Sequence, residues 1–105
     1  MAPRFEPVDL GELVQSVVGA LSAKAERHGI DLGATGAPGI AVHGDREQLT
    51  VLLNNLVENA LRFTPHGGVV DVVAGTRNDR PALCVIDSGP GIPEAERGRV
   101  FERFH

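Results

Sequence analysis

Two stretches with apolar residues at helical spacing, connected through short strand-like runs, constrain the fold of this chain more than any other feature. The first is Leu10–Arg27, where Asp9 stands at the N-cap position. The second is Arg46–Phe63, which begins after Asp45 and ends where Pro65 disfavours a helical conformation in the residue before it. The pattern therefore predicts two amphipathic helices that each bury one side.

Strand-like runs account for most of the remaining sequence. These runs are residues 29–36, 39–45, 67–76 and 80–87. A turn at "RNDR" joins the last two. Residues 5–10 predict an edge strand or an extended lead-in, and residues 99–105 predict a short helix or an irregular tail. Helices mixed with strands that pair mostly as hairpins favour an α+β fold, a two-layer α/β sandwich with the helices on one face of a mixed sheet.

Length and charge exclude several classes of function. With 105 residues, the chain is sized for one globular domain. A net charge of −4 disfavours nucleic acid and anionic membranes as partners, because both attract basic surfaces. No apolar run can span a bilayer and no signal peptide is evident, so we expect a cytoplasmic domain without direct membrane contact. The single cysteine, Cys84, excludes an internal disulfide and is expected in the core, with a reactive thiol as the alternative.

The second helix carries two asparagines on its polar side, although asparagine is unfavourable inside a helix. At about 100° per residue, the apolar side gathers Leu49, Leu52, Leu53, Leu56, Ala60 and Phe63. The opposite side gathers Gln48, Asn55, Glu58, Asn59 and Arg62. A solvated face is the ordinary interpretation, yet Glu, Lys, Gln or Ala would serve such a face better.

Asparagine offers a short, uncharged amide whose oxygen can coordinate a hard cation. Mg²⁺ takes oxygen ligands, keeps several waters and is commonly shared with substrate phosphates. Arg62, three residues after Asn59, lies on the same side and is placed to reach a phosphate oxygen. The polar side of this helix therefore suits a metal–phosphate site.

A second candidate binding segment is "CVIDSGPGIP", where a strand ends at Asp87 and Gly89 and Gly91 follow. A carboxylate only accepts hydrogen bonds, so Asp87 suits the exocyclic amine of adenine and repels the carbonyl of guanine. The glycines let a flat base approach the main chain closely, and Ile86 and Ile92 offer apolar cover. A tight turn, with Asp87 as a cap or a salt-bridge partner, is the alternative.

Together these motifs resemble the ATP-binding catalytic domain of bacterial two-component sensor histidine kinases, a branch of the Bergerat-fold ATPases. "DREQLTVLLNNLVENALRFTP" resembles the N box of that family, "VIDSGPGIP" its first glycine box and "VFERF" its F box. The segments "FEPVDLGELVQSVV" and "KAERHGIDL" are similar to the usual beginning of this domain. The resemblance covers essentially all of residues 1–105 and implies the Bergerat fold.

For the helix, the resemblance implies that Asn59 is the principal Mg²⁺ ligand, that Asn55 assists at the metal and the phosphates, and that Arg62 contacts phosphate. Hydrolytic members resembling gyrase carry a glutamate at the position of Asn55, where it activates water. Because an amide cannot act as a base, we expect slow hydrolysis and a γ-phosphate kept for a transfer partner. Glu58 is a candidate for polarising the acceptor imidazole, with an ordinary surface glutamate as an equal alternative.

For the nucleotide base, the resemblance implies that Phe63 lines or stacks on adenine and that Asp87 accepts a hydrogen bond from the adenine amine. The pocket would be shaped by Gly89 and Gly91, beside Ile92. The mobile lid over the nucleotide would be anchored by Phe101 and Phe104. The cofactors implied are ATP and Mg²⁺.

The second glycine box of the family, which holds phosphates at a helix start, has no counterpart before His105. We therefore expect residues 1–105 to form a C-terminally truncated catalytic domain that lacks the last helix and strands. Such a domain would be inactive alone and able to self-associate through its uncovered face. No histidine has the sequence context of the phosphoacceptor, so we expect surface positions for all four, His28, His43, His66 and His105.

The resemblance implies an enzyme that, within a larger kinase with a possible membrane anchor, transfers the γ-phosphate of ATP to a histidine of a dimerisation domain. A response regulator would be the downstream partner. Two alternatives stay open: a catalytically incomplete, regulatory nucleotide-binding module that docks on a kinase dimer, and a related serine kinase that acts on a regulatory protein.

Overall fold

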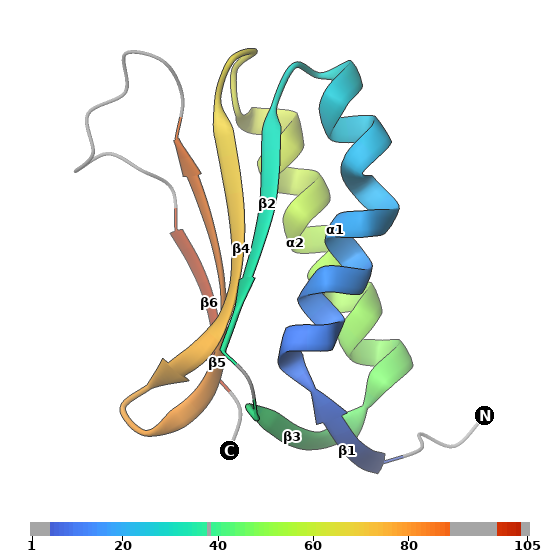
Figure 1. Ribbon diagram of the computed structural model, residues 1–105, viewed down its shortest axis with the longest axis vertical. Coiled ribbons are helices and arrows are strands. Elements are labelled where there is room, and N and C mark those ends of the chain that lie inside the picture. Colours follow the sequence, from blue (N-terminus) through green and yellow to red (C-terminus); the bar gives the residue numbers. More distant parts are fainter. Residues whose placement is uncertain (1–4, 38, 89–98, 104–105) are drawn as a thin grey trace.

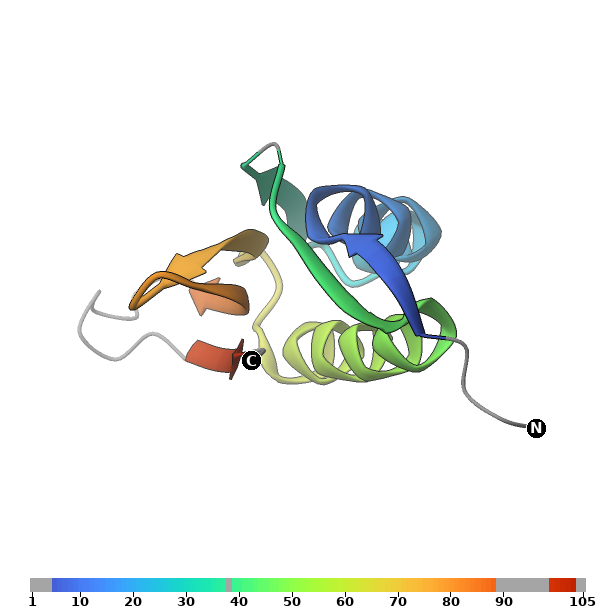
Figure 2. The same cartoon turned by 90° about the horizontal axis from the view of Figure 1, so that it is seen from below.

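Two helices and a mixed sheet make the two layers of the fold. The computed structural model describes residues 5–37, 39–88 and 99–103. One layer consists of α1 (Leu10–Arg27) and α2 (Arg46–Phe63). The other is a sheet of four strands, β2 (Asp31–Gly36), β4 (Val69–Arg77), β5 (Arg80–Ser88) and β6 (Arg99–Arg103). Both helices cover the same face of this sheet (Figures 1 and 2), which confirms the predicted α+β two-layer arrangement.

Both helices have the predicted bounds because each begins at an aspartate cap. One carboxylate oxygen of Asp9 accepts a hydrogen bond from the N–H of Glu12 at 3.1 Å, and Asp45 accepts from the N–H of Gln48 at the same distance. A cap of this kind contributes about 1 kcal/mol, because it satisfies a donor that the helix itself leaves free. These caps fix where α1 and α2 start.

A glycine ends α1 and turns the chain into β2. Gly29 has a φ of 67°, a left-handed conformation that favours glycine. The N–H of Gly29 donates to the carbonyl of Glu26, and the N–H of Ile30 donates to that of Ala25, both at 3.0 Å. This pair of bonds is the Schellman arrangement, which satisfies the last carbonyls of a helix. Because Ile30 and Ala25 are both buried, the turn also closes one end of the core.

The strand pairing is less local than the predicted set of hairpins. β4 and β5 form an antiparallel hairpin as predicted, and β2 pairs in parallel with β4 across the whole of α2. A separate antiparallel ribbon joins β1 (Phe5–Asp9) to β3 (Ala41–Asp45), with α1 between them in the chain. The prediction for residues 99–105 is wrong over β6, which pairs antiparallel with β5. The strand β5 is therefore paired on both sides, with β4 and with β6.

The hairpin between β4 and β5 turns through two residues in the left-handed region, Asn78 with a φ of 53° and Asp79 with a φ of 63°. Positive φ at both central positions is typical of the two-residue turns that match strand twist, where glycine is preferred at the second position. We expect Asp79→Gly to raise the free energy of unfolding by up to about 1 kcal/mol. Urea unfolding measures this, and Asp79→Ala, which keeps the steric cost of a side chain, should give no gain.

The core lies between the helices and the inner face of the sheet. α1 contributes Leu10, Leu13, Val14, Val17, Leu21 and Ala25. The two central strands contribute Val70, Val72, Ala74, Leu83 and Val85. The remaining side chains of this core are Ile30, between α1 and β2, and Leu53, Val57, Ala60 and Leu61 of α2.

The buried side of α2 differs from the predicted one. Leu53, Val57 and Leu61 are completely buried, whereas Phe63, predicted on the apolar side, is 73% exposed. The reason is that α1 packs beside α2. The side of α2 that faces both α1 and the sheet is therefore the one that carries Leu53, Val57 and Leu61, spaced four residues apart. Leucines occur over a wide arc of α2, and periodicity alone therefore misplaced the centre of the buried side.

Candidate nucleotide-binding site

α2 presents a row of polar side chains on the side away from the core. Asn55, Asn59 and Arg62 are all exposed, as predicted, and stand at i, i+4 and i+7 on one face. Among the described residues, neither asparagine side chain takes part in a hydrogen bond. Both amides are therefore available to a ligand that approaches from solvent.

The end of α2 carries a cation beside an aromatic ring. The Cζ atom of Arg62 lies 5.4 Å from the centroid of the Phe63 ring, a cation–π contact on the surface. Arg62 follows Asn55 and Asn59, here called the asparagine row, on the same exposed face of α2. An exposed ring and an exposed guanidinium at one helix end suit the predicted roles of Phe63 at a base and Arg62 at a phosphate.

Glu58 lies on the flank of α2 that faces α1. Its Oε1 atom is 3.3 Å from the Nζ atom of Lys24 on α1, and the two side chains are 39% and 41% exposed respectively. Exposed pairs of this kind contribute about 0.2–1 kcal/mol. Glu58 therefore helps to join the helices, and the geometry leaves both predicted interpretations of its carboxylate in place.

Asp87 lies near the end of β5 on the helix side of the sheet. It stands directly opposite Val70, which is completely buried in the core, and paired residues of neighbouring strands share a face. Ile86 therefore lies on the outer face, opposite Asp71. The expectation that Ile86 covers a base bound at Asp87 is wrong, because successive residues of a strand point to opposite sides.

A glycine brings the end of α2 and the end of β5 together. A Cβ atom at Gly68 would overlap the methyl group of Thr64 and stand 2.7 Å from the carbonyl oxygen of Ser88. Thr64 caps the C-terminus of α2, and Ser88 follows Asp87 directly. The carbonyl of Gly68 also accepts from the N–H of Asp31 at 3.0 Å, which ties this junction to β2. The end of α2 and the end of β5, the two elements that carry the predicted halves of the site, thus meet at Gly68.

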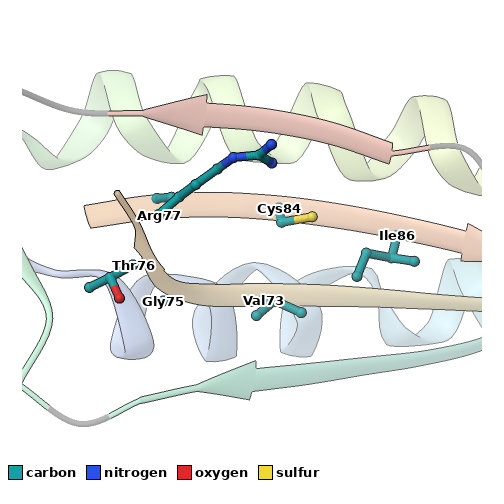
Figure 3. Close-up of a pocket in the computed structure, with 7 residues that line it drawn as sticks. Val73, Gly75, Thr76, Arg77, Cys84 and Ile86 are labelled. Carbon is teal, nitrogen blue, oxygen red and sulfur yellow. The ribbon is translucent and has the colours of Figure 1, made fainter. Parts of the chain in front are cut away.

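The outer face of the sheet holds a separate cavity of about 410 Å³ (Figure 3). Its described lining residues are Val73, Gly75, Thr76, Arg77, Ala82, Cys84 and Ile86. Cys84 is buried, as predicted, and faces this cavity. A second cavity of about 500 Å³, beside the start of α1, is lined by Asp9, Gly11, Glu12, Gln15, Gly36, Ala37 and Arg46. None of the described residues that line this second cavity was predicted to bind nucleotide, whereas Ile86 of the first was predicted to cover the base.

Several predicted site residues cannot be placed. Gly89, Gly91, Ile92 and Phe104 lie outside the described residues, as does His105. Phe101 lies in β6 opposite Cys84. Motif spacing did not point to Thr64 or Gly68, although "TPHGG" directly after α2 is the signal that marks them.

The described residues were compared with the predicted magnesium site. Within residues 5–37, 39–88 and 99–103, no group of three His, Cys, Asp or Glu side chains is arranged to hold a metal ion. His28, His43 and His66 are exposed, as predicted. The site predicted at α2 is of a different kind, because its ligands would be amide oxygens, waters and phosphate, which Mg²⁺ accepts. No helix in the described part of the chain is long and apolar enough to cross a membrane.

A family of known proteins matches the part of the chain that contains this site. The family described as histidine kinase-, DNA gyrase B- and HSP90-like ATPase matches residues 44–105, which is more than half of the chain and includes α2, β4 and β5. The chain is a member of this ATPase family. The ATPase domain contains the asparagine row and Asp87 within the matched residues.

Relatives of the ATPase domain are sensor kinases. It is 38% identical over 105 residues to the histidine kinase BaeS of Escherichia coli (strain K12), covering all of this chain and 22% of BaeS. It is 37% identical over 102 residues to the sensor protein SphS of Synechococcus elongatus, covering 97% of this chain and 25% of SphS. The domain thus spans about a quarter or less of these relatives.

Solved structures agree with this placement. The catalytic domain of histidine kinase ThkA matches the ATPase domain with a TM-score of 0.74 and 28% identity, over 88% of this chain and 64% of that one. Full-length ShkA in complex with AMPPNP matches with a TM-score of 0.74 and 28% identity, over 90% of this chain and 21% of ShkA. The resemblance to the catalytic domain of sensor histidine kinases is confirmed.

Proposed function

We propose that this domain binds Mg²⁺–ATP between the exposed side of α2 and the end of β5, and that a longer kinase uses it to phosphorylate a histidine. The observation that carries this proposal is the junction at Gly68, where the helix with the asparagine row and the strand with Asp87 come together. The helix α2 supplies amide oxygens and a guanidinium group for a metal ion and phosphates. The strand β5 supplies a carboxylate for a base.

The residues on α2 and on β5 would bind different parts of the nucleotide. Asn59 and Asn55 would hold the magnesium ion through their amide oxygens, and Arg62 would donate to a phosphate oxygen. The metal, when bound, offsets the negative charge of the phosphates. Asp87 would accept a hydrogen bond from the adenine amine. These roles divide the nucleotide between α2 and β5.

The proposed reaction transfers a phosphoryl group to an imidazole nitrogen. The bond between the γ-phosphorus and the bridging oxygen of ADP breaks, and a phosphorus–nitrogen bond to the acceptor histidine forms. ADP leaves with the bonding electron pair, and the imidazole N–H proton passes to a base, for which Glu58 is the candidate. We propose that the acceptor is on a separate dimerisation domain, because no histidine within residues 1–105 has the sequence context of the phosphoacceptor.

The relatives support a nucleotide and a regulator as ligand and partner. ShkA has been solved with AMPPNP, an analogue of ATP, and ThkA has been solved in complex with the response regulator TrrA. We propose by analogy that a response regulator receives the phosphoryl group from the histidine in the pathway of this protein. We also propose that the domain works on the cytoplasmic side, where ATP is available.

Titration of a fluorescent adenine nucleotide, with and without Mg²⁺, tests the proposed binding in the protein at its native length. We expect saturable binding that weakens when EDTA removes the metal. Incubation with γ-labelled ATP and a separate histidine-bearing helical hairpin should then give acid-labile phosphohistidine. Absence of saturable binding would refute the function, whereas binding without phosphohistidine would favour a regulatory module and an acid-stable product a serine kinase.

The role of Glu58 has a matched control on α1. We expect Glu58→Gln to slow phosphoryl transfer at least about tenfold, because the amide cannot polarise the imidazole. Lys24→Met breaks the same ion pair but keeps the carboxylate, so transfer should stay within about twofold of wild type while stability falls by less than about 1 kcal/mol. Single-turnover transfer rates measure both. Equal rates for Glu58→Gln and wild type would leave Glu58 as a surface glutamate.

A further inference from the structure

The outer face of the sheet, which is turned away from both helices, is recessed between β4 and β5 (Figure 3). Ala82 and Cys84 line the cavity of about 410 Å³ on this face, yet they are only 5% and 7% exposed, so they lie at its base. Their partners on β4, Gly75 and Val73, line the same cavity. Pockets for small molecules have volumes of about 300–1,000 Å³ and mainly apolar linings. The size and the lining of this cavity both fit that description.

A glycine in β4 leaves space in the cavity. Gly75 stands opposite Ala82, and these two form the smallest pair of side chains along the hairpin. A Cβ atom at Gly75 would meet no atom of the described residues within 4 Å, and its backbone is outside the left-handed region. Neither the described packing nor the backbone conformation therefore requires glycine here. Glycine inside a strand weakens the strand and often marks a site that a ligand approaches closely.

The two ends of the cavity differ in charge. Arg77 lines the cavity, and its side chain extends across β5 on the same face as Cys84 (Figure 3). Arg80 pairs with Arg77 and adds a second positive charge at the turn of the hairpin, whereas Asp71 stands opposite Ile86 at the other end. A guanidinium group has several N–H donors, so Arg77 can bind an anionic group in addition to its contacts within the chain. Apolar walls thus lead to a cationic end, in a chain whose net charge is −4.

We propose that this cavity binds a small amphiphilic anion, a molecule with an apolar body and one carboxylate or similar group. The apolar body would lie against Val73 and Ile86, and the anionic group would accept hydrogen bonds from Arg77. The asparagine row belongs to α2, and Asp87 lies on the helix side of the sheet. The cavity is therefore separate from the proposed nucleotide site, and its ligand would bind whether or not the domain binds ATP.

Filling the cavity from within β4 separates ligand binding from folding. Gly75→Val places a β-branched side chain in open space, so we expect the midpoint of thermal unfolding to stay equal or to rise. The affinity for octanoate should fall at least about tenfold, because the valine occupies space that the apolar body needs. Isothermal titration calorimetry of the protein at its native length, with octanoate below its micelle concentration, measures this affinity.

Gly19→Ala is the matched control for Gly75→Val. Gly19 is exposed on α1, and a Cβ atom there would likewise meet nothing within 4 Å. Alanine is the better helix former, so the midpoint of thermal unfolding should also rise, while octanoate affinity stays within about twofold of wild type. The two variants thus share a gain in stability, and only Gly75→Val fills the cavity.

The anionic group of the ligand is tested at Arg77. Arg77→Gln should weaken octanoate binding about 3- to 10-fold, because a charge-assisted hydrogen bond is lost. The affinity for 1-octanol, which has no carboxylate, should stay within about twofold in the same variant. In NMR spectra, octanoate should shift the amide signals of Val73, Gly75 and Cys84. A saturating concentration of Mg²⁺–ATP should leave octanoate bound.

Four results would overturn the assignment of this cavity. Equal octanoate affinity in Gly75→Val and wild type, or displacement of octanoate by Mg²⁺–ATP, would place the binding elsewhere. Equal weakening of octanoate and 1-octanol in Arg77→Gln would show that the anionic group is not recognised. A wild-type protein that does not bind octanoate has no such site, and a dimer that Gly75→Val dissociates in analytical ultracentrifugation would then show that a second copy covers this face. Each of these results leaves the nucleotide titration, and with it the proposed function, unchanged.

Discussion

Asn59→Ala is expected to weaken Mg²⁺-dependent ATP binding by about 10- to 100-fold, the loss of a charge-assisted contact. The substitution should not harm the fold, because Asn59 is exposed and alanine is a better helix former by a few tenths of a kcal/mol. Stability and affinity should thus change in opposite directions. The nucleotide titration with and without Mg²⁺, together with thermal unfolding, measures both.

Asn54→Ala is the matched control for Asn59→Ala. Asn54 is the same residue type on the same helix, but it is only partly exposed and lies away from the asparagine row. We expect its affinity for Mg²⁺–ATP to stay within about twofold of wild type, because no contact to nucleotide is removed. If Asn54→Ala and Asn59→Ala bind equally well, the asparagine row is a solvated face and the metal site lies elsewhere.

Leu61→Ala is expected to lower the free energy of unfolding by about 2–5 kcal/mol, which can unfold a domain of this size. Leu61 is completely buried where α2 meets α1 and the sheet. Truncation removes apolar contacts and leaves a cavity that close-packed neighbours fill only in part. Urea unfolding followed by circular dichroism measures the loss.

The matched control for Leu61→Ala is Phe63→Ala, two residues further along α2. Phe63 is 73% exposed, so its truncation should change stability by no more than about 0.5 kcal/mol despite the larger side chain. A larger loss in Phe63→Ala than in Leu61→Ala would restore the buried side that periodicity predicted. The pair therefore tests the orientation of α2 about its own axis.

Local signals predicted the helices accurately, and tertiary contacts decided the rest. Asp9 and Asp45 are read from the sequence because capping depends on residues three positions apart. The parallel pairing of β2 with β4 depends on segments that lie far apart in the chain, where no local pattern specifies a partner. The orientation of α2 likewise depends on α1, which periodicity within α2 does not contain.

The candidate site was predictable in parts. The spacing of Asn55, Asn59 and Arg62 follows from helix geometry, and the structure places all three on one exposed face. The approach of Thr64 to Ser88 joins two segments of different elements, so only the fold shows it.

The parallel pairing of β2 with β4 has a consequence for the order of folding. It closes a loop that contains all of α2, so the final place of the helix depends on strands that are distant in sequence. Such long-range closure slows folding, because the entropy of the loop is lost before its contacts are gained. A nascent chain is therefore expected to acquire the proposed nucleotide-binding surface late, so that ATP would meet a domain that is already assembled.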